Sequence, residues 1–74
     1  MTLDKTPLGS TVRIVSLENS DIVTLRLMEM GMVPGAQVRI VKIAPLGDPI
    51  QVCVRNYHLA LRRAEAQSIN VTLE

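Results

Sequence analysis

Cys53 and His58 are the single cysteine and the single histidine of the chain, and a thiol near an imidazole could support either nucleophilic catalysis or metal binding. Asn56 marks a tight turn, either a two-residue turn of residues 56 and 57, for which Tyr57 is a poor second residue, or a longer loop. With the two-residue turn, Cys53 lies opposite Ala60 and His58 is its diagonal neighbour. Diagonal neighbours on a sheet are about 7–8 Å apart, too far for a nucleophile and its base to share a hydrogen bond. We therefore expect no catalytic site, and we expect that the chain is not an enzyme.

Metal binding would need more ligands than Cys53 and His58 supply. A structural site usually has four ligands, so this pair would require a second molecule to complete it. Met28, Met30 and Met32 are spaced by two, and a helix distributes residues at that spacing over different faces. Methionines in such a pattern are typical of core filling or of an adaptable surface. We expect no built-in metal site and no cofactor.

Composition excludes further classes of function. The 74 residues include 8 Lys and Arg and 7 Asp and Glu, a net charge of +1, whereas nucleic-acid-binding proteins are usually strongly basic. One tyrosine provides no platform for stacking bases. The chain begins without a signal-peptide pattern, and no apolar run approaches the roughly 20 residues of a membrane span. We expect one cytoplasmic domain over residues 1–74, with no nucleic-acid partner and no direct membrane insertion.

Alternating apolar residues between prolines and glycines predict short strands. The pattern indicates strands at residues 10–17, 36–43 and 50–55, around 59–61, and at 69–73, with a bend or bulge near 42–43. A turn of helix is expected at residues 63–68. The predicted core consists of the inward-facing strand residues Val12, Ile14, Val38, Ile40, Ile50, Val52, Val54, Leu59, Leu61, Ile69 and Val71.

Residues 21–30 are expected to form a helix directly after the first strand. Ser20 is a suitable N-cap, Asp21 suits the positive end of the helix dipole, and Gly31 can end the helix in a left-handed conformation. Two apolar stripes run along this helix, one containing Val23, Leu27 and Met30 and the other Ile22, Leu25 and Met28. A surface helix normally has one such stripe. The second is either covered by loops or exposed for contact with a partner or another copy.

The order of these elements favours a small all-β fold. Five short strands with tight connections and no βαβ spacing predict an antiparallel β-barrel of about five strands, with a short α-helical insertion after strand 1. Loops on a rigid barrel often carry binding residues. We expect the partner-binding surface to combine the end of the helix with the loop that follows the second strand. Its candidate residues are Met30, Met32, Leu46, Gly47, Asp48 and Pro49.

Three segments of the chain resemble the FeoA family. Residues 25–35 resemble its short helix ending in Met-Gly-hydrophobic-x-Pro-Gly, residues 44–50 resemble its most recognisable segment, and residues 59–71 resemble its ending. The likeness runs from about residue 8 to residue 73. Two positions depart from the family pattern: Asn56 stands where Gly is frequent, and Cys53 stands where an outward polar residue is usual.

The resemblance implies an SH3-like barrel and a role in bacterial ferrous iron uptake. It implies a small accessory or adaptor protein in the cytoplasm, peripheral to the inner membrane through its partner. That partner would be the FeoB transporter, whose cytoplasmic part carries a G-protein domain. Two alternatives stay open: a module that binds or carries Fe2+ or Mn2+, and a self-assembling structural protein that forms a homo-oligomer.

Overall fold

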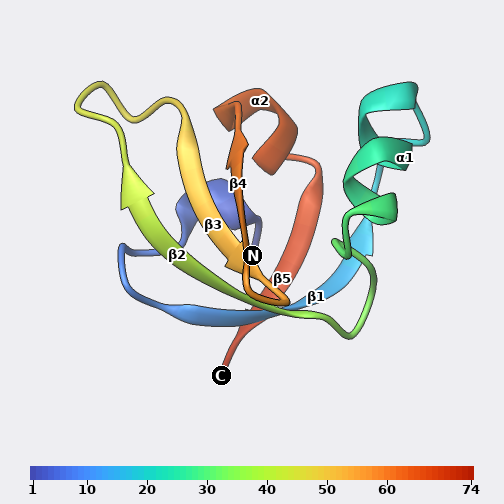
Figure 1. The fold of residues 1–74 in the computed structure, drawn as a ribbon, viewed down its shortest axis with the longest axis horizontal. Helices are drawn as coiled ribbons and strands as arrows, with labels where there is room; N and C mark the ends of the chain where they lie inside the picture. The colour runs from blue at the N-terminus through green and yellow to red at the C-terminus, as the bar shows by residue number, and fades with distance from the viewer.

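Five antiparallel strands form one strongly curved sheet (Figure 1). The computed structural model describes residues 1–74. Along the chain, the elements are η1 (Leu3–Lys5), β1 (Thr11–Leu17), α1 (Ile22–Glu29), β2 (Gln37–Ile43), β3 (Ile50–Val54), β4 (Tyr57–Leu61), α2 (Arg63–Ala66) and β5 (Ile69–Leu73). The strand order in the sheet is β4-β3-β2-β1-β5. The predicted all-β architecture with a helix after the first strand is confirmed, whereas the 3-10 helix η1 was not predicted.

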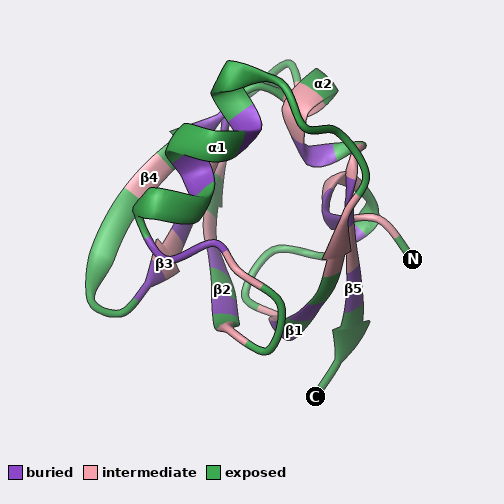
Figure 2. Ribbon diagram, turned by 90° about the vertical axis from the view of Figure 1, so that its right-hand side faces the viewer, coloured by how far each residue is buried: buried purple, intermediate pink, exposed green.

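The core lies on the concave face of the sheet (Figure 2). All the predicted strand residues are buried there except Leu59, which is only partly buried and packs against the core from its edge. Elements outside the strands supply four further core residues that the strand pattern did not predict. These are Leu3 from η1, Leu27 from α1, Met32 from the segment after α1, and Ala66 from α2.

The β3–β4 turn differs from the expected one. Arg55 and Asn56 have φ values of 51° and 67°, so these two residues form the turn, and Val54 pairs with Tyr57. The prediction of an Asn56-Tyr57 turn is therefore wrong. Positive φ at both central positions of a two-residue hairpin is unfavourable for an aromatic residue, and asparagine tolerates it well. The register changes by two residues, so inward residues still pair with inward residues and the core is preserved.

A β-bulge interrupts the β2–β3 pairing between Ile40 and Lys42. The expected irregularity is thus present, beginning slightly earlier than predicted. A second register shift, between Ile14 and Ser16 in the β1–β5 pairing, was not anticipated. Bulges bend a strand and increase its twist, which helps a five-stranded sheet to curve around its core.

Both ends of α1 are closed by local hydrogen bonds. Asp21, rather than the predicted Ser20, is the N-cap: its Oδ1 accepts a 2.9 Å hydrogen bond from the Thr24 amide. Hydrogen bonds from Thr24 stabilise the charged form of this carboxylate and lower the pKa of Asp21. At the other end Gly31 has a φ of +105°, as predicted. The Met32 amide donates to the Leu27 carbonyl at 3.0 Å, which completes a Schellman motif.

The two edges of the sheet differ in what covers them. At β5 the N-terminal segment pairs with the edge through a bridge between Thr2 and Asn70, and the Val71 amide donates to the Met1 carbonyl at 2.8 Å. At β4 no segment pairs with the outer edge. None of the helices combines the length and apolar character needed to span a membrane.

Candidate functional site: an apolar contact surface

Helix α1 uses very little of its surface to pack on the sheet. Leu27 and Thr24 are its buried residues, at 7% and 4% exposure. The apolar stripe predicted to be surplus is not covered by loops. The exposed apolar side chains of the helix and its C-cap are Ile22, Val23, Leu25, Met28 and Met30.

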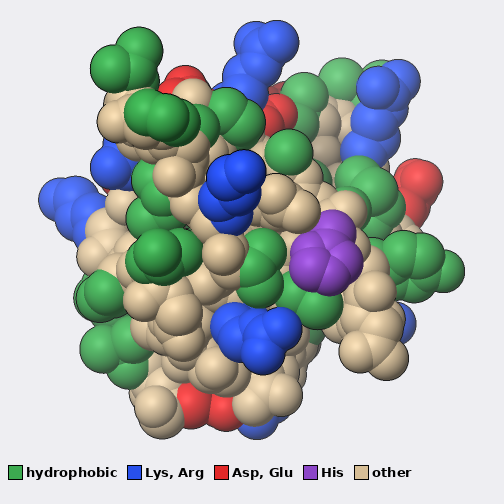
Figure 3. All heavy atoms as spheres, turned by 60° about the vertical axis from the view of Figure 1, so that its left-hand side comes forward, with side chains coloured by type: hydrophobic (Ala, Val, Ile, Leu, Met, Phe, Trp, Pro, Cys, Tyr) green, Lys and Arg blue, Asp and Glu red, His purple; other side chains and the backbone are tan.

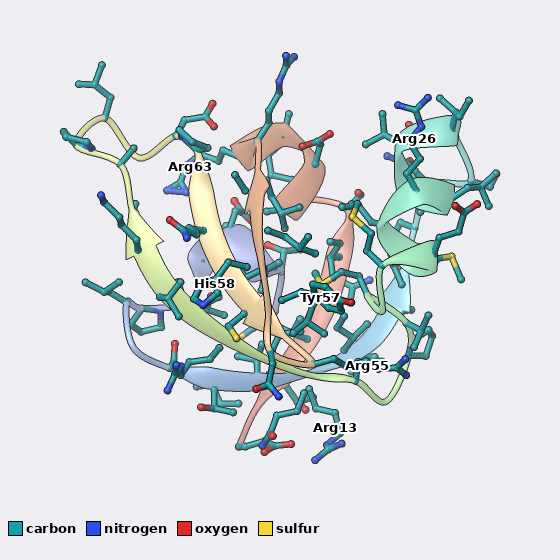
Figure 4. All side chains as sticks on the ribbon, in the orientation of Figure 1. Arg13, Arg26, Arg55, Tyr57, His58 and Arg63 are labelled. Carbon is teal, nitrogen blue, oxygen red and sulfur yellow. The ribbon has the colours of Figure 1, made fainter.

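A groove of about 350 Å³ separates the end of α1 from the β3–β4 hairpin. Glu29 and Met30 line it on the helix side, and Arg55, Tyr57 and Leu59 line it on the hairpin side. Figure 4 shows Arg55 and Tyr57 pointing from the hairpin toward the end of α1. This groove continues the exposed apolar surface of the helix onto strand β4.

Arg55 reaches the end of the helix because Gly31 leaves space for it. A Cβ built on Gly31 would lie 3.2 Å from Arg55 Cδ. Gly31 therefore has two roles: it permits the positive φ of the helix ending, and it accommodates the arginine that borders the groove.

The loop between β2 and β3 projects from the opposite side of the molecule (Figure 1). Its tip residue, Leu46, is 96% exposed. Arg63 anchors the loop, since its backbone amide donates to Asp48 Oδ1 at 3.1 Å and its Nη1 donates to the Asp4 carbonyl at 2.9 Å. Gly47 lies beside the same guanidinium group, and the Asp48–Pro49 peptide bond is cis. The loop is thus held to α2 and η1, with its leucine free.

The residues predicted to form one partner-binding surface do not lie together. Met30 is 43% exposed at the end of α1. The end of α1 and the loop that carries Leu46 lie on opposite sides of the molecule (Figure 1). Met32 is fully buried, so its prediction as a surface residue is wrong. The Schellman turn at Gly31 reverses the chain and directs Met32 into the core beside Leu27. Two separate surfaces therefore remain, one on α1 and its groove and one on the Leu46 loop.

Cys53 and His58 lie directly opposite one another on β3 and β4. The expected diagonal placement is wrong, because it followed from the incorrect turn. Both side chains are on the convex face, where Gln51 Nε2 lies 3.5 Å from His58 Nδ1. Figure 3 shows this face, with basic and apolar side chains around the histidine and acidic ones toward the margin. No three Cys, His, Asp or Glu side chains are grouped where they could hold one metal ion.

The family model for the FeoA domain matches residues 1–73 of the chain. The chain belongs to the FeoA family. A curated relative is 36% identical over 73 residues, which is 99% of this chain and 9% of that protein. It is the Fe(2+) transport protein A/Fe(2+) transporter FeoB fusion protein of Porphyromonas gingivalis. The chain thus spans a small part of the relative that it matches.

Solved structures of FeoA proteins share the fold. Iron(II) transport protein A from Clostridium thermocellum is 41% identical, with a TM-score of 0.93 over 99% of this chain and 45% of that one. FeoA from Stenotrophomonas maltophilia, complexed with zinc, is 36% identical, with a TM-score of 0.87 over 97% of this chain and 89% of that one. That protein is described as a prokaryotic SH3 domain protein. The SH3-like architecture implied by the resemblance is therefore confirmed.

Sequence reasoning missed the hairpin side of the FeoA groove. The sequence placed Arg55 at the end of a predicted strand, Tyr57 in the turn and Leu59 in the core, whereas all three line the groove. One signal was available: Tyr57 is the only aromatic residue of the chain, and aromatic residues favour strands over turns. The incorrect turn assignment placed Tyr57 in a loop and so hid its position in strand β4.

Proposed function

We propose that this chain is an accessory protein of bacterial ferrous iron uptake that acts by contact with the cytoplasmic part of a FeoB-type transporter. The exposed apolar stripe of α1 carries the proposal. Ile22 and Leu25 are 66% and 51% exposed. Large apolar side chains of a small domain are normally buried in its core, so their exposure on α1 needs an explanation. Such a patch is typical of a surface that a partner covers.

Membership of the FeoA family, which is linked to ferrous iron transport, supports this partner. A relative in which the FeoA and FeoB proteins form one chain supports it further, because fusion keeps the two parts close together. Such a partner would place this chain beside the inner membrane on the cytoplasmic side. The contact would be a binding function without catalysis.

The Leu46 loop is proposed as a second contact. Leu46 projects from a loop that Arg63 already holds in place, so few rotatable bonds of the loop would lose freedom on docking. Gly47, Asp48 and Pro49 give this loop its shape and present the leucine. A preorganised loop loses less conformational entropy on binding than a flexible one.

Binding to a purified FeoB-type transporter and to its isolated G-protein domain tests the proposal, with Fe(II) either present or chelated. Leu25→Asp and Leu46→Ala probe the two surfaces separately. Leu8→Asp is a matched control, because Leu8 is similarly exposed, at 62%, but lies in the loop before β1. We expect Leu25→Asp to weaken binding at least tenfold and Leu8→Asp to leave it unchanged.

Equal loss of binding in Leu25→Asp and Leu8→Asp would show that the effect is not specific to α1. Normal binding by Leu46→Ala would remove the loop from the proposal while leaving α1 in it. A folded chain that binds no transporter, and that binds one Fe(II) per monomer, would instead identify a metal-binding module.

A further inference from the structure

Strand β4 is an edge without the usual protection against further pairing. Its five residues, Tyr57–Leu61, include no lysine, acidic residue or proline, and these are the residues that commonly block an exposed edge. The opposite edge, β5, is covered by Met1 and Thr2. The molecule therefore leaves open one edge, and that edge borders the apolar groove.

The register shows which backbone groups are unpaired at this edge. In a two-residue hairpin the residues flanking the turn, here Val54 and Tyr57, form a hydrogen-bonded pair, and bonded and non-bonded pairs then alternate along the strands. His58 and Ala60 belong to the non-bonded pairs, so their N–H and C=O groups point away from β3. Both residues are exposed, and no turn or loop hydrogen bond reaches either one.

Side chains beside this edge could receive those of an added strand. Tyr57 and Leu59 alternate with His58 and Ala60, and their side chains line the groove together with Met30. Leu59 is only partly buried, although it packs against the core. Alternate apolar side chains of an extended segment beside β4 would enter this groove and complete the burial of Leu59.

Charge favours a partner segment over a second copy of this chain. Pairing of β4 with a second copy would bring Arg55 and Arg62 of both chains to one pair of edge strands, and Tyr57–Leu61 has no acidic residue to balance them. Like charges brought together at one interface oppose association. The single ion pair of the molecule joins Arg13 to Glu74, so Arg55 and Arg62, near the two ends of β4, are both available to external carboxylates.

We propose that β4 receives an extended segment from the cytoplasmic part of the FeoB-type transporter, which adds to the sheet as a further strand. The segment has apolar side chains at alternate positions and acidic residues at its ends. Hydrogen bonds to the backbone of His58 and Ala60 hold it, and the groove beside Tyr57 selects its side chains. This inference rests on the proposed function and specifies how the partner is bound.

Substitutions at Ala60 test the edge directly. Proline at position 60 removes an outward N–H and crowds the edge, but it leaves the β3–β4 hydrogen bonds in place because that N–H does not face β3. Ala60→Val is the matched control, since it adds a side chain of similar size and keeps the N–H. Tyr57→Thr probes the groove with a residue that also favours strands. Circular dichroism establishes that each variant is folded.

The assay measures binding of each variant to the purified cytoplasmic part of the transporter. We expect Ala60→Val to bind like the wild type and Ala60→Pro and Tyr57→Thr to bind at least ~10-fold more weakly. In hydrogen exchange on the wild-type complex, the amides of His58 and Ala60 should become protected. If Ala60→Pro does not fold, the binding of Tyr57→Thr and the hydrogen exchange of the wild-type complex decide whether a strand is added at β4.

Different outcomes separate this inference from the proposed function. If the wild type binds, but Ala60→Pro binds as tightly as Ala60→Val or the two amides stay unprotected, the added strand is refuted and the adaptor function stands. If the wild type does not bind the transporter, the proposed function falls, and the added strand falls with it. Self-association of the wild type that Ala60→Pro abolishes, without transporter binding, would identify a second copy as the occupant.

Discussion

The two methionines that flank Gly31 should differ greatly in how much stability is lost when each is replaced by alanine. Met32 is fully buried in the core, whereas Met30 is 43% exposed at the edge of the groove. Replacing a buried methionine by alanine removes apolar burial and leaves a cavity, at a cost of about 2–5 kcal/mol. Replacing a substantially exposed side chain typically changes stability by about 0.5 kcal/mol or less. Met32→Ala should therefore be destabilised far more than Met30→Ala.

That cost is large relative to the stability expected for a chain of this size. At about 0.05–0.15 kcal/mol per residue, 74 residues give a free energy of unfolding of roughly 4–11 kcal/mol. For domains of 60–100 residues, each kcal/mol lost lowers the melting temperature by about 4–8 °C. Met32→Ala should thus melt at least ~8 °C below the wild type.

Urea and thermal unfolding of the wild type, Met30→Ala and Met32→Ala, followed by circular dichroism, check this prediction. Similar unfolding free energies for the two variants, or a greater loss in Met30→Ala, would refute the placement of Met32 in the core. Binding of the folded Met30→Ala variant to the transporter would then test the groove independently of stability.

Three further perturbations have defined outcomes. Gly31→Ala should cost about 1 kcal/mol or more in unfolding free energy, because alanine strains the +105° φ and crowds Arg55. The pKa of Asp21 is lowered in the folded state, so its carboxylate stabilises the fold at neutral pH, and this stabilisation is lost as the pH falls through the lowered pKa. In an acid titration followed by circular dichroism, Asp21→Asn should lack the loss of stability that protonation of Asp21 causes in the wild type. Arg63→Ala keeps the backbone hydrogen bond to Asp48 but removes the guanidinium group that lies beside Gly47, so it should accelerate amide exchange around Gly47, whereas Arg62→Ala, the matched control, should not.

Patterns of neighbouring residues predicted most of the fold. Alternation of apolar side chains located the strands, because burial of one sheet face imposes a period of two on any half-buried strand. Gly31 marked the end of α1, since a left-handed residue is needed there and glycine adopts that conformation without strain. The sequence also predicted which residues of the β3–β4 hairpin face inward. The turn was misplaced, but the register error was two residues, so inward residues still paired with inward residues.

The candidate site was less predictable, because it depends on contacts between distant segments. Met32 looked like a surface residue beside Met30, and its burial follows from the direction in which the Schellman turn returns the chain. Similarly, the helix end and the loop of Leu46 were expected to form one binding surface, but the curvature of the sheet places them on opposite sides.

The sequence by itself determined the all-β architecture, the helix after the first strand and the likeness to the FeoA family, because periodicity and turn residues act over a few neighbouring positions. The tertiary structure alone decided which stripe of α1 is uncovered and that the open edge at β4 borders a groove. Each of these depends on how elements far apart in the chain pack together, and packing energies summed over many long-range contacts are not encoded in any local pattern.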